Sequence, residues 1–432
     1  MKVCCLINKN DDFTVDDSEI LNFFDKSHLH YTFFNVGSLR NFYRLERFFN
    51  HSAIDLYYLS IAIYFADRIK LRKDSDDGWT REFTIYLPVL CLNEMQSVTK
   101  KLKNLIEYLT GDKWNFELRR RIGLNTQEER IKKGVERARK KAQPEFFSML
   151  SGGLDSYIGA IDLLEKNLNV FFVSHYGGGK GVKDYQDLVR KNLTNNYNIS
   201  KTNFFSFHLA ALNGIEDTTR SRSFMFFMHA LVIASQVENS IEILVPENGF
   251  ISLNIPFTNS RLGSNSTRTT HPYYINLLNK IIEELNIKIK FVNPYQFNTK
   301  GEMIENCLNK ILLNSTIIET MSCSHPDQGR YNGIKSPTHC GVCLPCIIRR
   351  ASINKGIGVD PTSYLDKHFL GDQAKLTLRS LKIGILDFER SVNTSFLKIL
   401  ASGNLPNKNP LFNKIYKNGM LEVKQLLDEY KG

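Results

Sequence analysis

The sequence has no apolar run of the length that a membrane-spanning helix needs, which is about 20 consecutive residues. Its first residues, Met1–Cys5, are typical of a short strand and lack the charged and apolar segments of a secretory leader. Internal repeats and low-complexity tracts are also absent from the sequence. We therefore expect a protein that makes no contact with a membrane.

Cysteine is scarce, and its spacing does not fit a disulfide framework. The chain has eight cysteines, and those at positions 4, 5, 91 and 307 follow no recognisable pattern. Disulfides persist mainly in secreted proteins, so this usage favours the reducing cytoplasm. The proportions of hydrophobic residues (42%) and charged residues (23%) are ordinary for a globular protein, while the net charge of +11 is high.

The lysine-bearing phosphate loop G-x-x-x-x-G-K-[ST] is missing, but a different glycine loop is present. The sequence SGGLDS follows the apolar run 146–150 and precedes a helix-like run. Gly152 and Gly153 allow the backbone to approach an anion closely, and the hydroxyls of Ser151 and Ser156 can donate to phosphate oxygens. This pattern predicts a phosphate-binding loop. The alternative is an ordinary turn, since Ser, Gly and Asp are common in turns.

Four other cysteines form the second strong pattern. They are Cys323, Cys340, Cys343 and Cys346. The last three make two overlapping C-x-x-C steps, which suit tetrahedral Zn²⁺. Four thiolates leave no open position on the metal, so we expect the Zn²⁺ to be structural. His325 and His339 are alternatives to the first cysteine, and reduced cysteines packed as small apolar residues are a further possibility.

Short apolar runs alternate with helix-like segments after residue 145. The runs are 146–150, 170–174, 203–208, 241–245 and 288–292. This alternation predicts an α/β fold with a doubly wound parallel sheet. Ligands of such sheets bind beyond the carboxyl ends of the strands, where Ser151–Ser156, 175–179 and 247–249 fall.

The length of the chain predicts more than one domain. Helix-like segments at 54–70 and 94–109 flank a strand-like segment at 83–92, which favours an extra N-terminal α+β domain. We expect an N-terminal leader domain (1–118), a basic linker (119–144), a nucleotide domain (145–322), a zinc-binding segment (323–365) and a helical tail (366–432).

SGGLDS together with the downstream C…CGxCxxC resembles the QueC family, 7-cyano-7-deazaguanine synthases that belong to the PP-loop ATP pyrophosphatases. The resemblance covers about residues 145–365 and implies a Rossmann-like HUP fold. Tyr176-Gly177 is similar to the family's YGQ element, 219–224 to its GRN-like element and 298–304 to its TK-x-E-I segment.

The resemblance implies ATP and Mg²⁺ as cofactors, a structural Zn²⁺, and 7-carboxy-7-deazaguanine as the substrate that is adenylated. It places nucleotide binding on Ser151, Gly152, Gly153, Asp155, Ser156, Tyr176, Gly177 and Glu247. An adenylating enzyme also needs positive charge near the α-phosphorus. Lys300, Arg222 and Lys180 are the candidates for that catalytic role.

The chain departs from the family pattern around the expected substrate pocket. Gly178 replaces the glutamine of YGQ, and Ser223 stands where the GRN-like element has asparagine. With Asp67-Arg68 and Trp79-x-Arg81 in the leader region, the chain is similar to the QueC-like component of Qat-type antiphage defence systems. This similarity implies that an amine of a partner protein from the same defence operon captures the adenylate. Capture of ammonia to form the nitrile is the alternative.

A strongly basic run separates the leader region from the glycine loop. It contains Arg119, Arg120, Arg121, Arg130, Lys132, Lys133, Arg137, Arg139, Lys140 and Lys141. Such a run can bind nucleic-acid phosphate, but it has few aromatic residues and is interrupted by glutamates. A solvated helix or a partner-docking surface is therefore favoured over a nucleic-acid site.

Two further functions fit parts of the pattern. A PP-loop enzyme that transfers sulfur to tRNA could use the same cysteines for an iron–sulfur cluster. A nucleotide-binding scaffold without catalytic activity could hold nucleic acid through the basic run.

Overall fold

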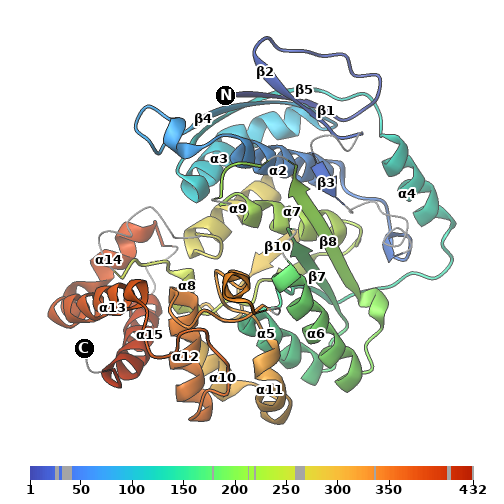
Figure 1. Cartoon of the computed structure of the whole chain (residues 1–432). Coiled ribbons are helices and arrows are strands. Elements are labelled where there is room, and N and C mark those ends of the chain that lie inside the picture. The colour runs from blue at the N-terminus through green and yellow to red at the C-terminus, as the bar shows by residue number, and fades with distance from the viewer. Residues whose placement is uncertain are drawn as a thin grey trace.

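The computed structural model of the chain describes residues 1–24, 29–31, 41–177, 180–212, 214–217, 220–257, 268–334, 337–405 and 410–430. Figure 1 shows two β-sheets, helices packed between and around them, and a helical C-terminal region at one side. No helix in these ranges combines the length and apolar character that crossing a bilayer requires.

The N-terminal sheet is parallel throughout. Its strands, in the order β2-β1-β4-β5, are β2 (Ser18–Asn22), β1 (Lys2–Leu6), β4 (Glu82–Val89) and β5 (Lys113–Arg120). Helix α2 (His51–Ile69) lies between β1 and β4 in the chain, and α3 (Leu92–Thr110) connects β4 to β5. The expected α+β character of this region is therefore wrong: its neighbouring strands are all parallel, and α2 and α3 lie in the connections that lead to β4 and β5.

The larger sheet carries the predicted alternation. In the order β10-β9-β6-β7-β8-β3, its strands are β10 (Ile289–Val292), β9 (Ile241–Leu244), β6 (Phe146–Met149), β7 (Val170–Tyr176), β8 (Phe204–Ala211) and β3 (Leu29–Tyr31). The first five are parallel, and β3 is antiparallel to β8. All five predicted strands of the nucleotide region are thus confirmed as neighbours in one parallel sheet. The edge strand β3 comes from the leader region.

Helices cover both faces of this sheet. Along β7, Phe171 and Val173 pack into one hydrophobic core, whereas Val170 and Phe172 pack into another on the opposite face. The second face is covered by α5 (Leu154–Glu165), α6 (Lys180–Asn196), α10 (Lys300–Asn306) and α11 (Lys310–Thr316). The first face is covered by α7 (Arg222–Ala234) and α9 (Pro272–Glu284).

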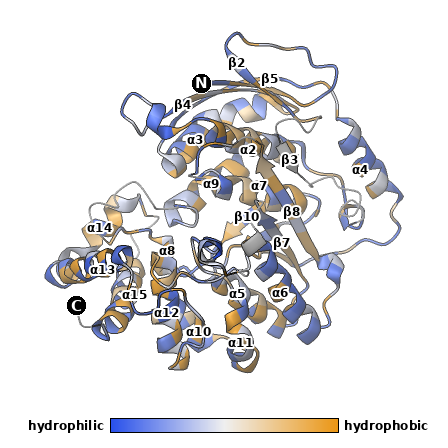
Figure 2. Cartoon of the chain, in the orientation of Figure 1, coloured by the Kyte–Doolittle hydropathy of each residue, from blue (hydrophilic) through white to orange (hydrophobic). Residues whose placement is uncertain are grey.

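Helix α2 joins the two sheets. It lies beside α7 in Figure 1 and packs against both β4 and β8. Figure 2 shows α2 and α7 as largely hydrophobic where they lie inside the molecule. Their side chains belong to one core that runs from Val3 to Phe291. The boundary expected at residue 118 falls within β5, and the basic segment 119–144 includes the end of that strand and α4 (Thr126–Arg137).

The C-terminal residues form a separate helical layer. Helices α12 (Leu344–Ile357), α13 (Asp372–Arg390), α14 (Ser395–Ser402) and α15 (Leu411–Asp428) share a third core with α8 (Gly249–Ser252). Short 3₁₀ turns lie at Arg72–Asp74, Lys201–Asn203, Ile317–Glu319, Gln328–Asn332 and Val392–Thr394. Helices α13 to α15 lie within the range 366–432, where a helical tail was expected.

A buried histidine in α7 makes the stability of this core sensitive to acid. His229 is fully buried, and its ring packs 5.2 Å from that of Tyr57 and 4.6 Å from that of Phe207. Its Nδ1 lies 2.7 Å from the carbonyl oxygen of Met225. Burial disfavours the charged imidazolium and lowers the pKa of His229 to about 4.

We expect His229 to destabilise the folded protein as the pH falls from about 6.5 towards 4. In this range His229 binds a proton in the unfolded chain, whereas its buried ring stays neutral in the folded chain. At pH 4.5 this contribution is about 2 to 3 kcal/mol relative to pH 7. Urea unfolding at both pH values should show a smaller difference for His229→Leu than for the unchanged protein. An equal difference in the two proteins would contradict this role.

Candidate functional site

The SGGLDS loop lies between β6 and α5 and is held by its own side chains. The hydroxyl oxygens of Ser151 and Ser156 are 3.0 Å apart, and each accepts a backbone N–H: that of Gly153 for Ser151 and that of Ser151 for Ser156, both at 3.2 Å. Gly152 has a φ of +85°, and a Cβ there would lie 3.1 Å from the backbone nitrogen of Gln186. Glycine is therefore required at this position by both conformation and space.

The loop presents backbone donors at the start of α5. The N–H groups of the first helical turn, Leu154 to Ser156, have no acceptor within α5. They lie at the positive end of the helix dipole. A loop of this kind can hold an anion. It lies where β6 and β9 are neighbours, the point at which the strand order changes direction. In open α/β sheets this switch point is the usual place for a ligand.

Lys300 contacts this loop directly, although 145 residues separate it from Asp155 in the sequence. Its Nζ lies 2.9 Å from Oδ1 of Asp155, and both side chains are about 5% exposed. Oδ2 of Asp155 accepts from the backbone N–H of Asn248 at 3.1 Å and from its side-chain amide at 2.7 Å. Burial by itself would raise the pKa of Asp155, but Lys300 and these donors outweigh it and lower the pKa to about 2.

Glu247 completes an acidic pair beside Lys300. Its Oε1 accepts from the side-chain amide of Asn248 at 3.2 Å. Burial, followed by the neighbouring charge of Asp155, raises the pKa of Glu247 well above its ordinary value. The loops after β6, β9 and β10 therefore bring one lysine and two carboxyl groups together. Such a set can bind a divalent cation or exchange a proton.

Within the described ranges, no hydrogen bond or ion pair links Tyr176, Gly177 or Arg222 to this centre. Tyr176 lies at the end of β7 with its ring 4.8 Å from that of His208, and Gly177 follows it in an exposed position. Arg222 is exposed at the start of α7 and forms no ion pair within the described ranges. Its charge contributes to the lowered pKa of His175, after the larger effect of burial. The side chain of Lys180 lies outside the described residues.

Gln186 is a site residue that sequence reasoning missed. It is buried in α6, and its side-chain amide donates to the carbonyl oxygens of Ser151 at 3.2 Å and His175 at 2.9 Å. It thereby joins the loop after β6 to the end of β7. A glutamine inside an amphipathic helix carries no sequence signal for this role, because the contact depends on how α6 packs.

The four predicted cysteines converge on one point. Their sulfur atoms all lie within 4.8 Å of one another. The Cys323–Cys343 and Cys340–Cys346 sulfur pairs are 3.8 and 3.9 Å apart, close to the separation of about 3.8 Å that Zn–S bonds of about 2.3 Å give in a tetrahedron. Backbone N–H groups of residues 325, 340 and 343 also point at these sulfurs at 3.3 Å. The cluster can therefore bind a metal ion such as zinc.

The nearby histidine is not part of this cluster. Nε2 of His339 accepts the backbone N–H of Ser322 at 3.3 Å, and burial lowers the pKa of the ring. The segment is tied to the glycine loop, since the N–H of Met321 donates to the carbonyl oxygen of Gly152 at 2.9 Å. Arg349 is fully buried and donates to the Ile317 carbonyl oxygen at 2.7 Å, so its role here is structural.

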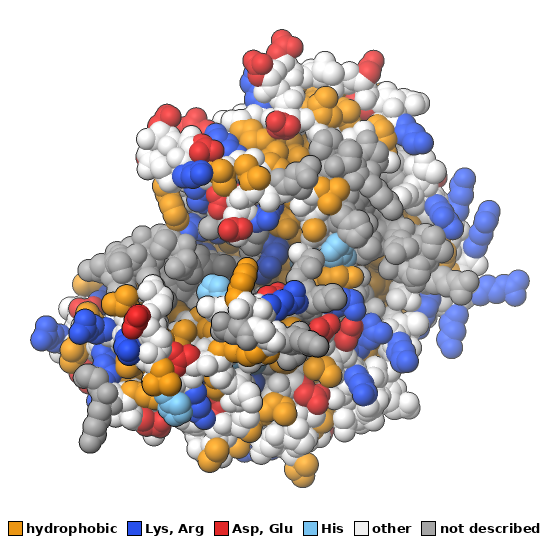
Figure 3. Space-filling model, viewed as in Figure 1, with side chains coloured by type: hydrophobic (Ala, Val, Ile, Leu, Met, Phe, Trp, Pro, Cys, Tyr) orange, Lys and Arg blue, Asp and Glu red, His pale blue; other side chains and the backbone are white. Residues whose placement is uncertain are grey.

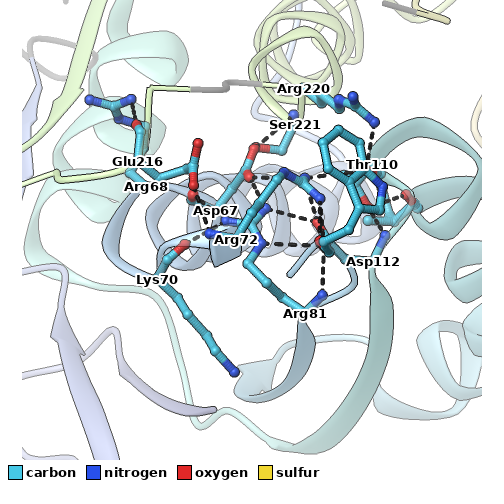
Figure 4. Close-up of polar contacts among 12 residues, drawn as sticks. Asp67, Arg68, Lys70, Arg72, Arg81, Thr110, Asp112, Glu216, Arg220 and Ser221 are labelled. Carbon is cyan, nitrogen blue, oxygen red and sulfur yellow. Dashed lines mark hydrogen bonds and ion pairs between the residues drawn. The ribbon is translucent and has the colours of Figure 1, made fainter. Parts of the chain in front are cut away.

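A network of buried charged residues connects the leader region to the nucleotide region (Figure 4). Arg81 and Arg72 both contact Asp112, each with one N–O distance of 2.8 Å. Arg81 also pairs with Asp67, and both side chains are fully buried. The Asp67-Arg68 and Trp79-x-Arg81 motifs therefore meet in space through this pair.

Asp67 extends the network to α7. Its Oδ2 accepts from the backbone N–H of Ser221 at 3.1 Å and from the Ser221 hydroxyl at 2.6 Å. A carboxylate at this position satisfies orphan donors and interacts favourably with the helix dipole. Ser221 belongs to the GRN-like segment and directly precedes Arg222. The leader region thus fixes the position of a loop at the carboxyl edge of the larger sheet.

We expect Asp67→Asn to destabilise the protein by about 3 kcal/mol or more, because it leaves Arg81 buried with one carboxylate fewer. Chemical unfolding should show the loss. Asp76→Asn, in the exposed turn before β4, is the matched control and should change the free energy of unfolding by less than about 0.5 kcal/mol. Equal effects of the two substitutions would show that the network adds no stability.

We expect the purified protein to contain one zinc ion per chain and to lose it in Cys343→Ser/Cys346→Ser, because two ligands cannot complete a tetrahedral site. Elemental analysis and the absorption spectrum provide the measurement. Cys91→Ser, outside the cluster, should keep its zinc. A brown protein that contains iron, or full zinc content in the double variant, would contradict this expectation.

Comparison of the chain with protein-family models, with curated proteins and with solved structures gave no match.

Proposed function

We propose that this protein uses ATP to adenylate the carboxylate of 7-carboxy-7-deazaguanine and then transfers the acyl group to an amine. The contact between Lys300 and Asp155 is the observation that carries the proposal. It joins the TK-x-E-I-like segment to the SGGLDS loop. Two motifs that resemble those of QueC are therefore in contact through buried side chains. The PP-loop fold that the resemblance implies remains part of the proposal.

In the first step, a carboxylate oxygen of the substrate attacks the α-phosphorus of ATP. The bond from that phosphorus to the oxygen bridging to the β-phosphorus breaks, and pyrophosphate leaves with the bonding electrons. The free N–H groups of the α5 first turn can donate to the pyrophosphate as its charge increases. The ammonium group of Lys300, next to this turn, can stabilise charge at the reacting phosphoryl group.

Glu247 and Asp155 are the side chains that would hold Mg²⁺ together with the phosphates of ATP. Bound Mg²⁺ supplies positive charge that helps the pyrophosphate to leave. Asn248 donates to both carboxyl groups and so fixes their orientation. Asp155 keeps its negative charge over the whole neutral range, since its pKa is lowered to about 2.

In the second step, an amine attacks the acyl carbon, AMP leaves, and the nitrogen loses a proton to water or to a nearby base. The altered YGQ-like and GRN-like segments support a protein amine as the acceptor, in place of ammonia. We propose that this amine belongs to a partner protein from the same antiphage defence operon. The Zn²⁺ in this proposal is structural and holds segment 323–350 against the glycine loop.

The first test is the identity of the ATP cleavage products. AMP and pyrophosphate should appear only when 7-carboxy-7-deazaguanine is present, and intact mass should show the deazaguanine acyl group on a protein encoded by a neighbouring gene. ADP and phosphate, or AMP that forms without the acid, would overturn the substrate assignment. AMP formation that depends on the acid, with free nitrile and unmodified proteins, would overturn only the conjugation step.

Lys300→Ala should lower kcat for AMP formation about a hundredfold or more, the usual cost of removing a donor that stabilises developing charge. Lys310→Ala, an exposed lysine at the start of α11, is the matched control and should leave kcat unchanged. Because the substitution leaves Asp155 buried without its cation, thermal unfolding of both variants should accompany the kinetics. A folded Lys300→Ala protein with normal kcat would exclude the catalytic role.

A further inference from the structure

Two grooves lined by basic residues lie outside the candidate site. The first, called here the α4 groove, has a volume of about 810 Å³. Its lining includes Tyr43, Glu129, Arg130, Lys133, Gly134 and Arg137. Its cations occur at positions i, i+3 and i+7 of α4, so they lie along one face of that helix.

Tyr43 forms one wall of the α4 groove. Its ring lies against α4 at Gly134, where a Cβ would be 2.2 Å from ring carbon Cε1. Glycine inside a helix is less favourable than alanine, and here it provides the space for the aromatic ring. The groove thus combines an aromatic side chain with a row of cations.

The second groove, called here the α6 groove, has a volume of about 710 Å³. Its lining includes Tyr176, Lys183, Gln186, Arg190, Lys191 and Lys201. It also pairs an aromatic side chain with several cations. At one end, Gln186 donates to the carbonyl oxygen of Ser151, so this groove reaches the glycine loop.

A hydrogen bond joins the segments that lie next to the two grooves in the sequence. The guanidinium group of Arg44, the neighbour of Tyr43, donates to the hydroxyl of Thr202, the neighbour of Lys201. Figure 3 shows Lys and Arg side chains gathered on the side of the molecule that carries α4 and again lower down, over α6. The grooves therefore belong to one side of the protein, although the sequence that forms them extends from residue 43 to residue 206.

Most of these groove cations form no ion pair with the acidic residues that the structure describes. Within the described ranges, six of the seven groove cations form no ion pair: Arg130, Lys133, Arg137, Arg190, Lys191 and Lys201. Lys183 is the exception, since it pairs with Asp187 at 2.6 Å. A row of uncompensated cations creates a positive potential that attracts polyanions.

We propose that the α4 and α6 grooves together bind a single-stranded nucleic acid. Cations that follow a backbone, combined with aromatic side chains on which bases stack, are the usual features of such sites. Tyr43 and Tyr176 supply the aromatic groups that the basic run 119–141 lacks in the sequence. None of the lining residues is an exposed large hydrophobic side chain of the kind that anchors a protein partner.

The binding surface is independent of the adenylation chemistry, and its geometry relates it to the candidate site. A strand that follows the α6 groove towards Gln186 ends beside Ser151. The end of a bound strand would then lie next to the carboxyl edge of the larger sheet. Nucleic-acid binding can be measured without the adenylation reaction. Failure of the proposed activity would therefore not contradict the proposed binding surface.

The test measures binding of fluorescently labelled 20-nucleotide oligo(U) and oligo(dT) by anisotropy over a range of salt concentrations. Affinity should fall as salt rises, and Arg130→Ala/Lys133→Ala/Arg137→Ala should reduce the slope of log K against log salt by about 2, at roughly 0.7 per lost phosphate contact. Tyr43→Leu should weaken binding about fivefold or more with an unchanged slope, because base stacking is not ionic.

Lys100→Ala/Lys280→Ala/Lys310→Ala removes the same charge from exposed positions on α3, α9 and α11 and should leave both affinity and slope close to those of the unchanged protein. If the two triple variants lose affinity equally, only the net charge matters and the proposal is wrong. Equal or tighter binding of polyglutamate would instead identify an acidic protein surface as the partner, and tighter binding of duplex DNA would exclude the single-strand preference.

Discussion

Helix α2 is apolar on nearly every side, and the arrangement of the two sheets follows from the need to cover it. A helix that is hydrophobic all round must be buried on all faces. The N-terminal sheet covers one side through β4, and α7 with β8 covers the other. One continuous core results, so the leader region and the nucleotide region cannot move independently without exposing α2 to water. The edge strand β3 joins the two regions a second time.

Burying α2 also buries the charged residue near its end. Arg81 and the donors of Ser221 replace the contacts with water that the Asp67 carboxylate loses on burial. The result is a carboxylate from the leader region that caps α7 of the nucleotide region. The same logic applies at the carboxyl edge, where Lys300 compensates Asp155. In both places a buried acid fixes the relative position of segments that are distant in sequence.

The sequence predicted the five parallel strands and the cysteine cluster because their signals are local: short apolar runs, glycines at a turn and thiols at fixed spacing. It did not predict that β5 includes Arg119 and Arg120, because a strand rich in charge looks like a linker until its partner β4 is known. The sequence also did not predict the roles of Gln186, Tyr43 and the Asp67–Arg81 pair, for a related reason. Their roles arise from packing between elements, which leaves no periodic signal in any one segment.

The charges at the candidate site constrain how a nucleotide can bind there. Two carboxyl groups, on Asp155 and Glu247, face a single cation on Lys300, so these three groups by themselves offer no net attraction to a triphosphate. Burial and the neighbouring charge of Asp155 raise the pKa of Glu247 above its ordinary value. In the proposed reaction, Asp155 and Glu247 would hold Mg²⁺ through their carboxylate oxygens, and the metal would supply the positive charge that these three groups lack. The acidic pair would then favour the nucleotide only when it carries its metal, which is the form that reacts.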